Sequence, residues 1–99
     1  LIKTKAVEIT DHGDETAFPY IEIDSKGGDI TLSIGSNSLT ILRTQTGIVT
    51  IDNEKGKVIQ EGLPLFTRGS WIKTNPGQNT LNISGNFTEA KFWNRSAYL

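Results

Sequence analysis

His12 is the only histidine in the 99-residue chain, which contains no cysteine. A Ser-His-Asp triad would therefore have to include this residue. His12 lies in the polar segment Asp11-His12-Gly13-Asp14-Glu15, which is typical of a solvated turn, and the sequence has no Gly-x-Ser-x-Gly nucleophile elbow. The lack of cysteine excludes a thiol nucleophile, a disulfide scaffold and a cysteine-ligated zinc site.

The acidic residues likewise indicate no catalytic or metal site. The turns Asp11–Glu15 and Asp52-Asn53-Glu54 lack the alternating carboxylates and the distal glutamate of a helix-loop-helix calcium site. The other glutamates stand at outward strand positions or in loops, and none forms a recognisable pair for glycoside hydrolysis. We therefore expect a protein that is not an enzyme and that needs no metal or cofactor.

The aromatic residues are the strongest candidates for ligand contact. Trp71, Trp93 and the run Trp93-Asn94-Arg95 combine rings that could stack on sugars with polar side chains that could bind hydroxyl groups. The candidate ligand-binding residues are thus Trp71, Trp93, Asn94 and Arg95. The alternative is that Trp71 packs the long loop against the core and that Trp93 or Phe92 closes one end of the fold.

Short alternating apolar and polar segments dominate the rest of the chain, and no window has the apolar spacing of a helix of three turns. These segments predict about eight short strands and an all-β fold, an antiparallel β-sandwich of the jelly-roll or galectin-like kind. Lys26-Gly27-Gly28 is expected to form a tight connection between two of these strands. Residues 61–78, with two prolines and three glycines, predict a long crossing between the sheets. The expected core consists of Val7, Ile9, Ile21, Ile23, Ile30, Leu32, Ile34, Leu39, Ile41, Val49, Ile51, Leu81, Ile83 and Phe92.

Length and charge narrow the class of protein further. Ninety-nine residues suit a single domain covering 1–99. Ten basic residues against eleven acidic ones give a net charge of −1, which does not suit phosphate-backbone binding, so we expect no nucleic-acid partner. No apolar run approaches the length of a membrane span, and the sequence shows no signal peptide, so we expect no membrane partner.

Several turn motifs, in their order and spacing, resemble one family over roughly residues 17–98. They are Phe18-Pro19-Tyr20-Ile21-Glu22-Ile23, the hairpin Ile48–Gly56, the apolar-aromatic step Gly69-Ser70-Trp71-Ile72, and the Pro-Gly turn and strand Asn75–Gly85. Together they resemble the C-terminal domain of siphovirus-type tail components, the distal tail proteins of long non-contractile phage tails and prophages. That domain is a β-sandwich likened to galectins and carbohydrate-binding modules.

The resemblance implies a structural component of a phage or prophage tail tip or baseplate. Its partners would be other tail or adhesion proteins, the full-length protein would associate with itself in a ring, and it would belong to a virion assembled in the bacterial cytoplasm. The chain starts at Leu1 and has no methionine, so we expect the C-terminal part of a longer protein whose N-terminal ring-forming domain is absent. The alternative is a carbohydrate-binding module that uses exposed aromatic residues, with a host-wall polysaccharide as partner.

Overall fold

The structure, a computed structural model of the chain, describes residues 3–11, 18–75 and 77–93. The described residues form an all-β antiparallel fold without a helix, as the sequence predicts. Its eight strands are β1 (Lys3–Asp11), β2 (Tyr20–Ile34), β3 (Asn37–Asp52), β4 (Lys57–Gln60), β5 (Leu63–Pro64), β6 (Thr67–Gly69), β7 (Gly77–Gly85) and β8 (Phe87–Trp93).

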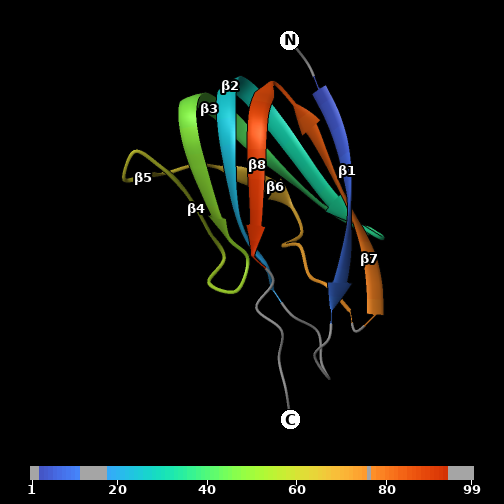
Figure 1. Cartoon of the computed structure of the whole chain (residues 1–99). Coiled ribbons are helices and arrows are strands. Elements are labelled where there is room, and N and C mark those ends of the chain that lie inside the picture. The colour runs from blue at the N-terminus through green and yellow to red at the C-terminus, as the bar shows by residue number, and fades with distance from the viewer. Residues whose placement is uncertain (1–2, 12–17, 76, 94–99) are drawn as a thin grey trace.

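The strands form two layers that share their longest members (Figure 1). The first layer contains β8, the first half of β2, the second half of β3, then β4 and β5. The second layer contains β1, β7, the second half of β2, the first half of β3 and β6. Because β2 and β3 cross from one layer to the other, the sandwich is a single hydrogen-bonded sheet folded over its own core.

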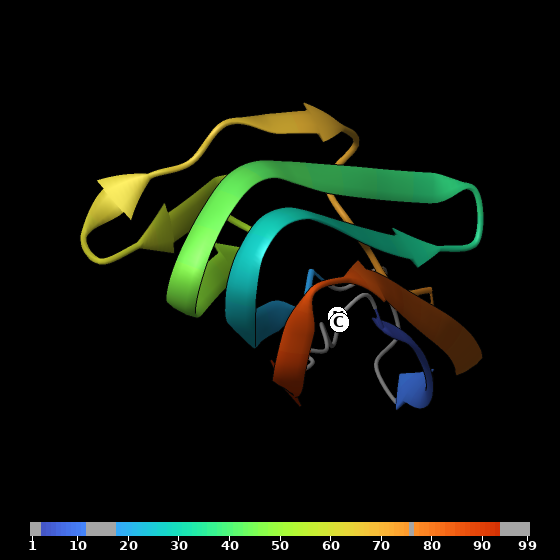
Figure 2. The ribbon, with the colours of Figure 1, turned by 90° about the horizontal axis from the view of Figure 1, so that it is seen from above.

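The strand count agrees with the sequence, but β2 and β3 are long where short strands were predicted. Lys26-Gly27-Gly28, predicted as a tight connection, lies inside β2 at the point where β2 and β3 bend together (Figure 2). Gly27 and Gly28 have φ values of 107° and 88°, which favour glycine, and the register with β3 shifts between Gly28 and Ile30. The bend therefore replaces the predicted turn.

The register shift also keeps both halves of β2 facing the core. Before the bend the buried residues are odd-numbered, as at Ile21 and Ile23, and after it they are even-numbered, as at Ile30 and Leu32. One extra residue in an alternating strand turns the apolar side chains that follow it to the opposite face of the strand. Because β2 also passes into the other layer at this point, that opposite face is again the one that meets the core. From the sequence alone, the change from odd-numbered to even-numbered apolar positions predicts two separate strands.

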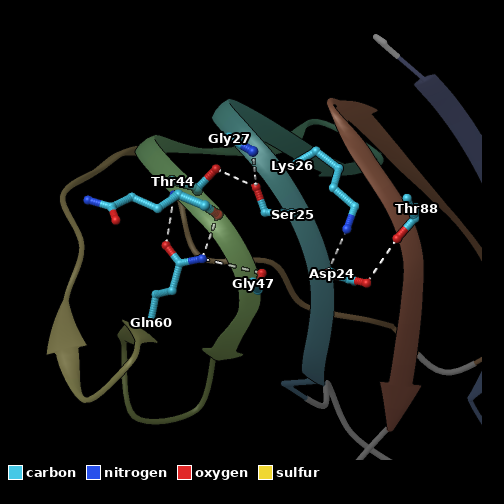
Figure 3. Close-up of polar contacts among 9 residues, drawn as sticks. Asp24, Ser25, Lys26, Gly27, Thr44, Gly47, Gln60 and Thr88 are labelled. Carbon is cyan, nitrogen blue, oxygen red and sulfur yellow. Dashed lines mark hydrogen bonds and ion pairs between the residues drawn. The ribbon is translucent and has the colours of Figure 1, made fainter.

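Buried hydroxyl groups satisfy the backbone at the bend (Figure 3). Ser25 and Thr44 are both buried, and their hydroxyl oxygens lie 2.6 Å apart. Ser25 Oγ also accepts a hydrogen bond from Gly27 N at 3.0 Å, and Thr44 Oγ1 donates to the carbonyl oxygen of Gly28. These bonds hold the two bent strands together where the regular ladder is interrupted.

A single apolar core lies between the layers, and it confirms most of the predicted set. Phe92 was predicted to be buried, but it is only half-buried at the margin, because β8 is a peripheral strand of the first layer. The backbones of Val7 and Ile9 lie in β1, and their side chains are outside the described part of the chain. The core residues are Ile21, Ile23, Ile30, Leu32, Ile34, Leu39, Ile41, Val49, Ile51, Val58, Ile72, Leu81, Ile83 and Phe87.

Residues 61–78 cross between the layers, as predicted. The segment leaves β4, forms β5 against β4 in the first layer, and then forms β6 against β3 in the second layer. It returns over the core, where Ile72 is fully buried. This crossing places Trp71 and an exposed apolar run at one side of the molecule.

Candidate functional site

Trp93 lies on the outer side of the first layer. It is the last residue of β8 and stands opposite Tyr20 of β2. The two rings are 5.7 Å apart between centroids and meet edge to face, and 46% of Trp93 is exposed. This pair offers an indole surface on which a flat ligand could stack. The other two predicted members of this site, Asn94 and Arg95, lie outside the described residues.

Trp71 has different surroundings and packs partly against the core. Its indole lies beside Gly56 of the β3–β4 turn, where an added Cβ would be in van der Waals contact, 3.4 Å from Cε2 and Nε1 of Trp71. Asn53 fixes the adjacent backbone: its Oδ1 accepts from Ile72 N at 2.9 Å and its Nδ2 donates to Pro19 O at 2.8 Å. Trp71 therefore packs the loop against the core, as the alternative interpretation expects, and its contact with a ligand stays a prediction.

The two tryptophans do not form one site in the described part of the chain. Trp71 is packed against the core, whereas Trp93 is not and instead contacts Tyr20. Trp71 lines an apolar hollow of about 370 Å³, together with Val58, Ile59, Pro64 and Leu65. The hollow lies between β4, β5 and the crossing segment.

An exposed apolar edge adjoins this hollow; we define it as Ile59, Leu63, Pro64, Leu65 and Phe66. Phe66 is 80% exposed, Leu63 67% and Ile59 38%. The edge includes β5, which extends at one side of the molecule beside β4 (Figure 1). Four consecutive apolar residues at the edge of a sheet are typical of a contact surface for another protein.

A second feature, which we call the amide groove, opens at the other layer and has a volume of about 730 Å³. Carboxamide side chains are its most frequent lining groups. Residues from the β2–β3 turn, from the segment before β7 and from β7 itself surround it. Its carboxamides are Asn37, Asn75, Gln78, Asn79 and Asn82, and Lys73 is the one charged residue among the described residues that line it.

The carboxamide of Asn79 in the amide groove is bound by the protein backbone. Asn79 Oδ1 accepts from Asn75 N at 3.0 Å, and Asn79 Nδ2 donates to the carbonyl oxygens of Asn75 at 2.8 Å and Gly77 at 3.2 Å. Asn37, Gln78 and Asn82 make no side-chain hydrogen bond to any part of the chain that the structure describes. Their amides are therefore available to a ligand.

Over residues 3–11, 18–75 and 77–93, no group of three or more acidic or histidine side chains is arranged to hold a metal ion. The same part of the chain contains no helix that could cross a membrane. His12, Asp14 and Glu15 lie outside it.

Comparison with known proteins gives no relative from which a role could be inferred. The sequence matches no protein-family model, and neither curated proteins nor solved structures give a significant match.

The amide groove was not among the sites predicted from the sequence. The sequence does show one sign of it, the alternation of the polar residues Gln78, Thr80 and Asn82 along one strand. It could not show that the β2–β3 turn lies beside that strand.

Proposed function

We propose that this chain is a non-enzymatic docking domain from the tail tip or baseplate of a phage or prophage, the C-terminal domain of a distal tail protein. The observation that carries this proposal is the apolar edge. The assignment to a phage tail rests on the order of turn motifs along the sequence, which resembles that of siphovirus-type tail components. The partner at the edge is a neighbouring tail or adhesion protein, and the full-length protein associates with itself in a ring.

The apolar edge suits a protein partner because the side chains of Ile59, Leu63 and Phe66 are exposed and the backbone of the run is fixed. Leu65 N donates to Val58 O at 2.9 Å, and Phe66 O accepts from Leu42 N at 2.9 Å, so the run is anchored to β4 on one side and to β3 on the other. Burying exposed leucine and phenylalanine side chains stabilises a complex by about 1.5–3 kcal/mol for each side chain. An anchored run also loses little conformational entropy on binding.

The docking proposal is tested by replacing Leu63 and Phe66 with serine in the phage or prophage gene. We expect particles without a functional tail tip, seen as a loss of infectivity and as defective tips by electron microscopy. Both side chains are largely exposed, so the purified variant should keep its circular dichroism spectrum. Ile48→Ser is the matched control because Ile48 is 51% exposed but lies outside the apolar edge. Normal tips and infectivity in the double variant would reject docking through this edge.

Localisation is tested independently of any variant. An antibody raised against the chain should label particles at the tail tip in immunogold microscopy. Label on the capsid, along the whole tail, or on no particle would reject the tail-tip assignment. The apolar edge could then still be tested as a surface for a different partner.

A carbohydrate-binding module is the second candidate, favoured by the exposed indole of Trp93 beside Tyr20. A sugar ring of a host-wall polysaccharide would stack on this indole, with Asn94 and Arg95 as its polar neighbours in sequence. Such stacking would change the indole fluorescence when polysaccharide is added. Docking of a protein at the apolar edge needs no such response.

A further inference from the structure

The amide groove lies where β7 extends beyond its neighbour. Strand β7 pairs with β1 along its whole length but with β2 only from Leu81 to Ser84. The residues from Gly77 to Thr80 therefore have no partner in β2, and the β2–β3 turn stands beside this gap. The groove is thus formed by the topology of the sheet and is separate from both tryptophans.

The walls of the groove are held by regular structure. Asn79 is buried, and its three hydrogen bonds join it to the backbone of Asn75 and of Gly77 at the start of β7. Thr80 Oγ1 donates to Glu8 Oε1 at 2.9 Å, which links β7 to β1 across the outer face. A ligand entering the groove therefore meets amides whose backbone is already ordered, and this lowers the entropic cost of binding.

The chemistry of the lining selects a class of ligand. Each carboxamide offers two N–H donors and a carbonyl acceptor, which matches sugar hydroxyl groups that both donate and accept. Among the described residues that line the groove, none is a carboxylate of the kind that binds a metal ion, and Lys73 alone is too little positive charge for a nucleic-acid backbone. A volume of about 730 Å³ is within the usual range for small-molecule sites.

We propose that the amide groove binds a neutral oligosaccharide, with Gln78 and Asn82 of β7 and Asn37 of the β2–β3 turn donating to and accepting from its hydroxyl groups. This site does not depend on the docking role of the apolar edge, and it is distinct from stacking on Trp93. In this proposal the sugar is recognised by hydrogen bonds to amide side chains on the second layer.

The test is an NMR titration of the isotope-labelled chain with neutral trisaccharides, namely cellotriose, maltotriose and tri-N-acetylchitotriose. The proposal expects at least one of them to shift the side-chain amide signals of Gln78 and Asn82. Because the ligand is neutral, the affinity should not change between low and high salt. No shift with any of the three sugars, shifts confined to the Trp93 indole, or affinity that falls steeply with salt would each overturn it.

Variants then show whether the amides themselves bind the sugar. Replacing both Gln78 and Asn82 by alanine should weaken binding about tenfold or more, because two hydrogen bonds are lost. Both residues are exposed and free of side-chain partners in the described structure, so the variant should keep its fold. Gln45→Ala is the matched control because Gln45 is an exposed amide outside the groove. Equal affinities in the double variant and the control would overturn the proposal.

Discussion

Buried amide side chains complete hydrogen bonds that the strands of this protein leave open. Gln60, the last residue of β4, pairs with Val49, and β3 continues beyond that point toward the bend. There the side chain of Gln60 takes the place of a strand: its Oε1 accepts from Gln45 N at 2.8 Å, and its Nε2 donates to Gln45 O at 2.6 Å (Figure 3). A weaker bond runs from Nε2 to Gly47 O at 3.3 Å.

Replacing Gln60 by alanine should lower the free energy of unfolding by about 1–3 kcal/mol, because backbone groups of Gln45 and Gly47 lose their partner in a partly buried region. Urea denaturation followed by circular dichroism measures this change. Gln45→Ala removes an exposed side chain but keeps the backbone N and O that bind Gln60, so it should change stability by about 0.5 kcal/mol or less. Similar losses in the two variants would show that the Gln60 amide does not stabilise β3.

At the scale of elements, β6 joins the crossing segment to the second layer through an unusually close approach. Gly69 of β6 stands opposite Leu39 of β3, and Ser70 N donates to Ser38 O at 2.8 Å. A Cβ on Gly69 would lie 2.2 Å from Ser38 O, and its φ of 101° also disfavours a side chain. Glycine is therefore required here for both conformation and space.

Gly69→Ala should separate β6 from β3 and lower the free energy of unfolding by about 1–3 kcal/mol or more. Gly62→Ala is the control that isolates the conformational cost, because Gly62 has a φ of 76° but nothing within 4 Å of an added Cβ. Chemical denaturation of both variants gives the comparison, and amide exchange at Leu42, whose N donates to Phe66 O beside β6, should accelerate only in Gly69→Ala. Equal destabilisation would mean that the contact with Ser38 adds nothing to the cost.

The elements also show what the sequence could and could not reveal. Alternation located most of the buried strand residues, because one face of each strand meets the core, but the predicted core lacked Val58 and included the half-buried Phe92. It could not show that β2 is continuous through Gly27 and Gly28, because a bulge changes the phase of the pattern as a new strand would. Ile72, in a crossing loop, and Phe87, just after the corner between β7 and β8, carry no periodic signal and were missed.

The candidate sites depended still more on arrangement. Phe66 and Leu63 are ordinary apolar residues until the short β5 leaves them at the edge of the sheet. Likewise Gln78 and Asn82 become part of a groove only because β2 ends its pairing with β7 at Leu81. Such features arise from the overlap of strands distant in sequence, which local pattern does not specify.

The two layers of the molecule are connected by continuous strands, so neither layer can unfold without affecting the other. Strands β2 and β3 run through both layers, and β7 leads directly into β8 across the corner at Gly85 and Asn86. Lys26 N donates to Asn86 O at 2.8 Å, which ties that corner to the bend of β2. Loss of either layer would expose the core face of the other, so the layers stabilise each other.

We therefore predict that the domain unfolds in one cooperative transition. In urea, tryptophan fluorescence should follow the first layer through Trp93 and Trp71, and circular dichroism should follow both layers. The two curves should coincide, with a slope of about 1–3 kcal/mol per molar urea. Native-state amide exchange should give the same opening free energy at Ile51 in the first layer and at Ile83 in the second, since both amides belong to one unit. A fluorescence transition that precedes the circular dichroism transition would mean that the first layer melts alone, and that the shared strands do not couple the two layers.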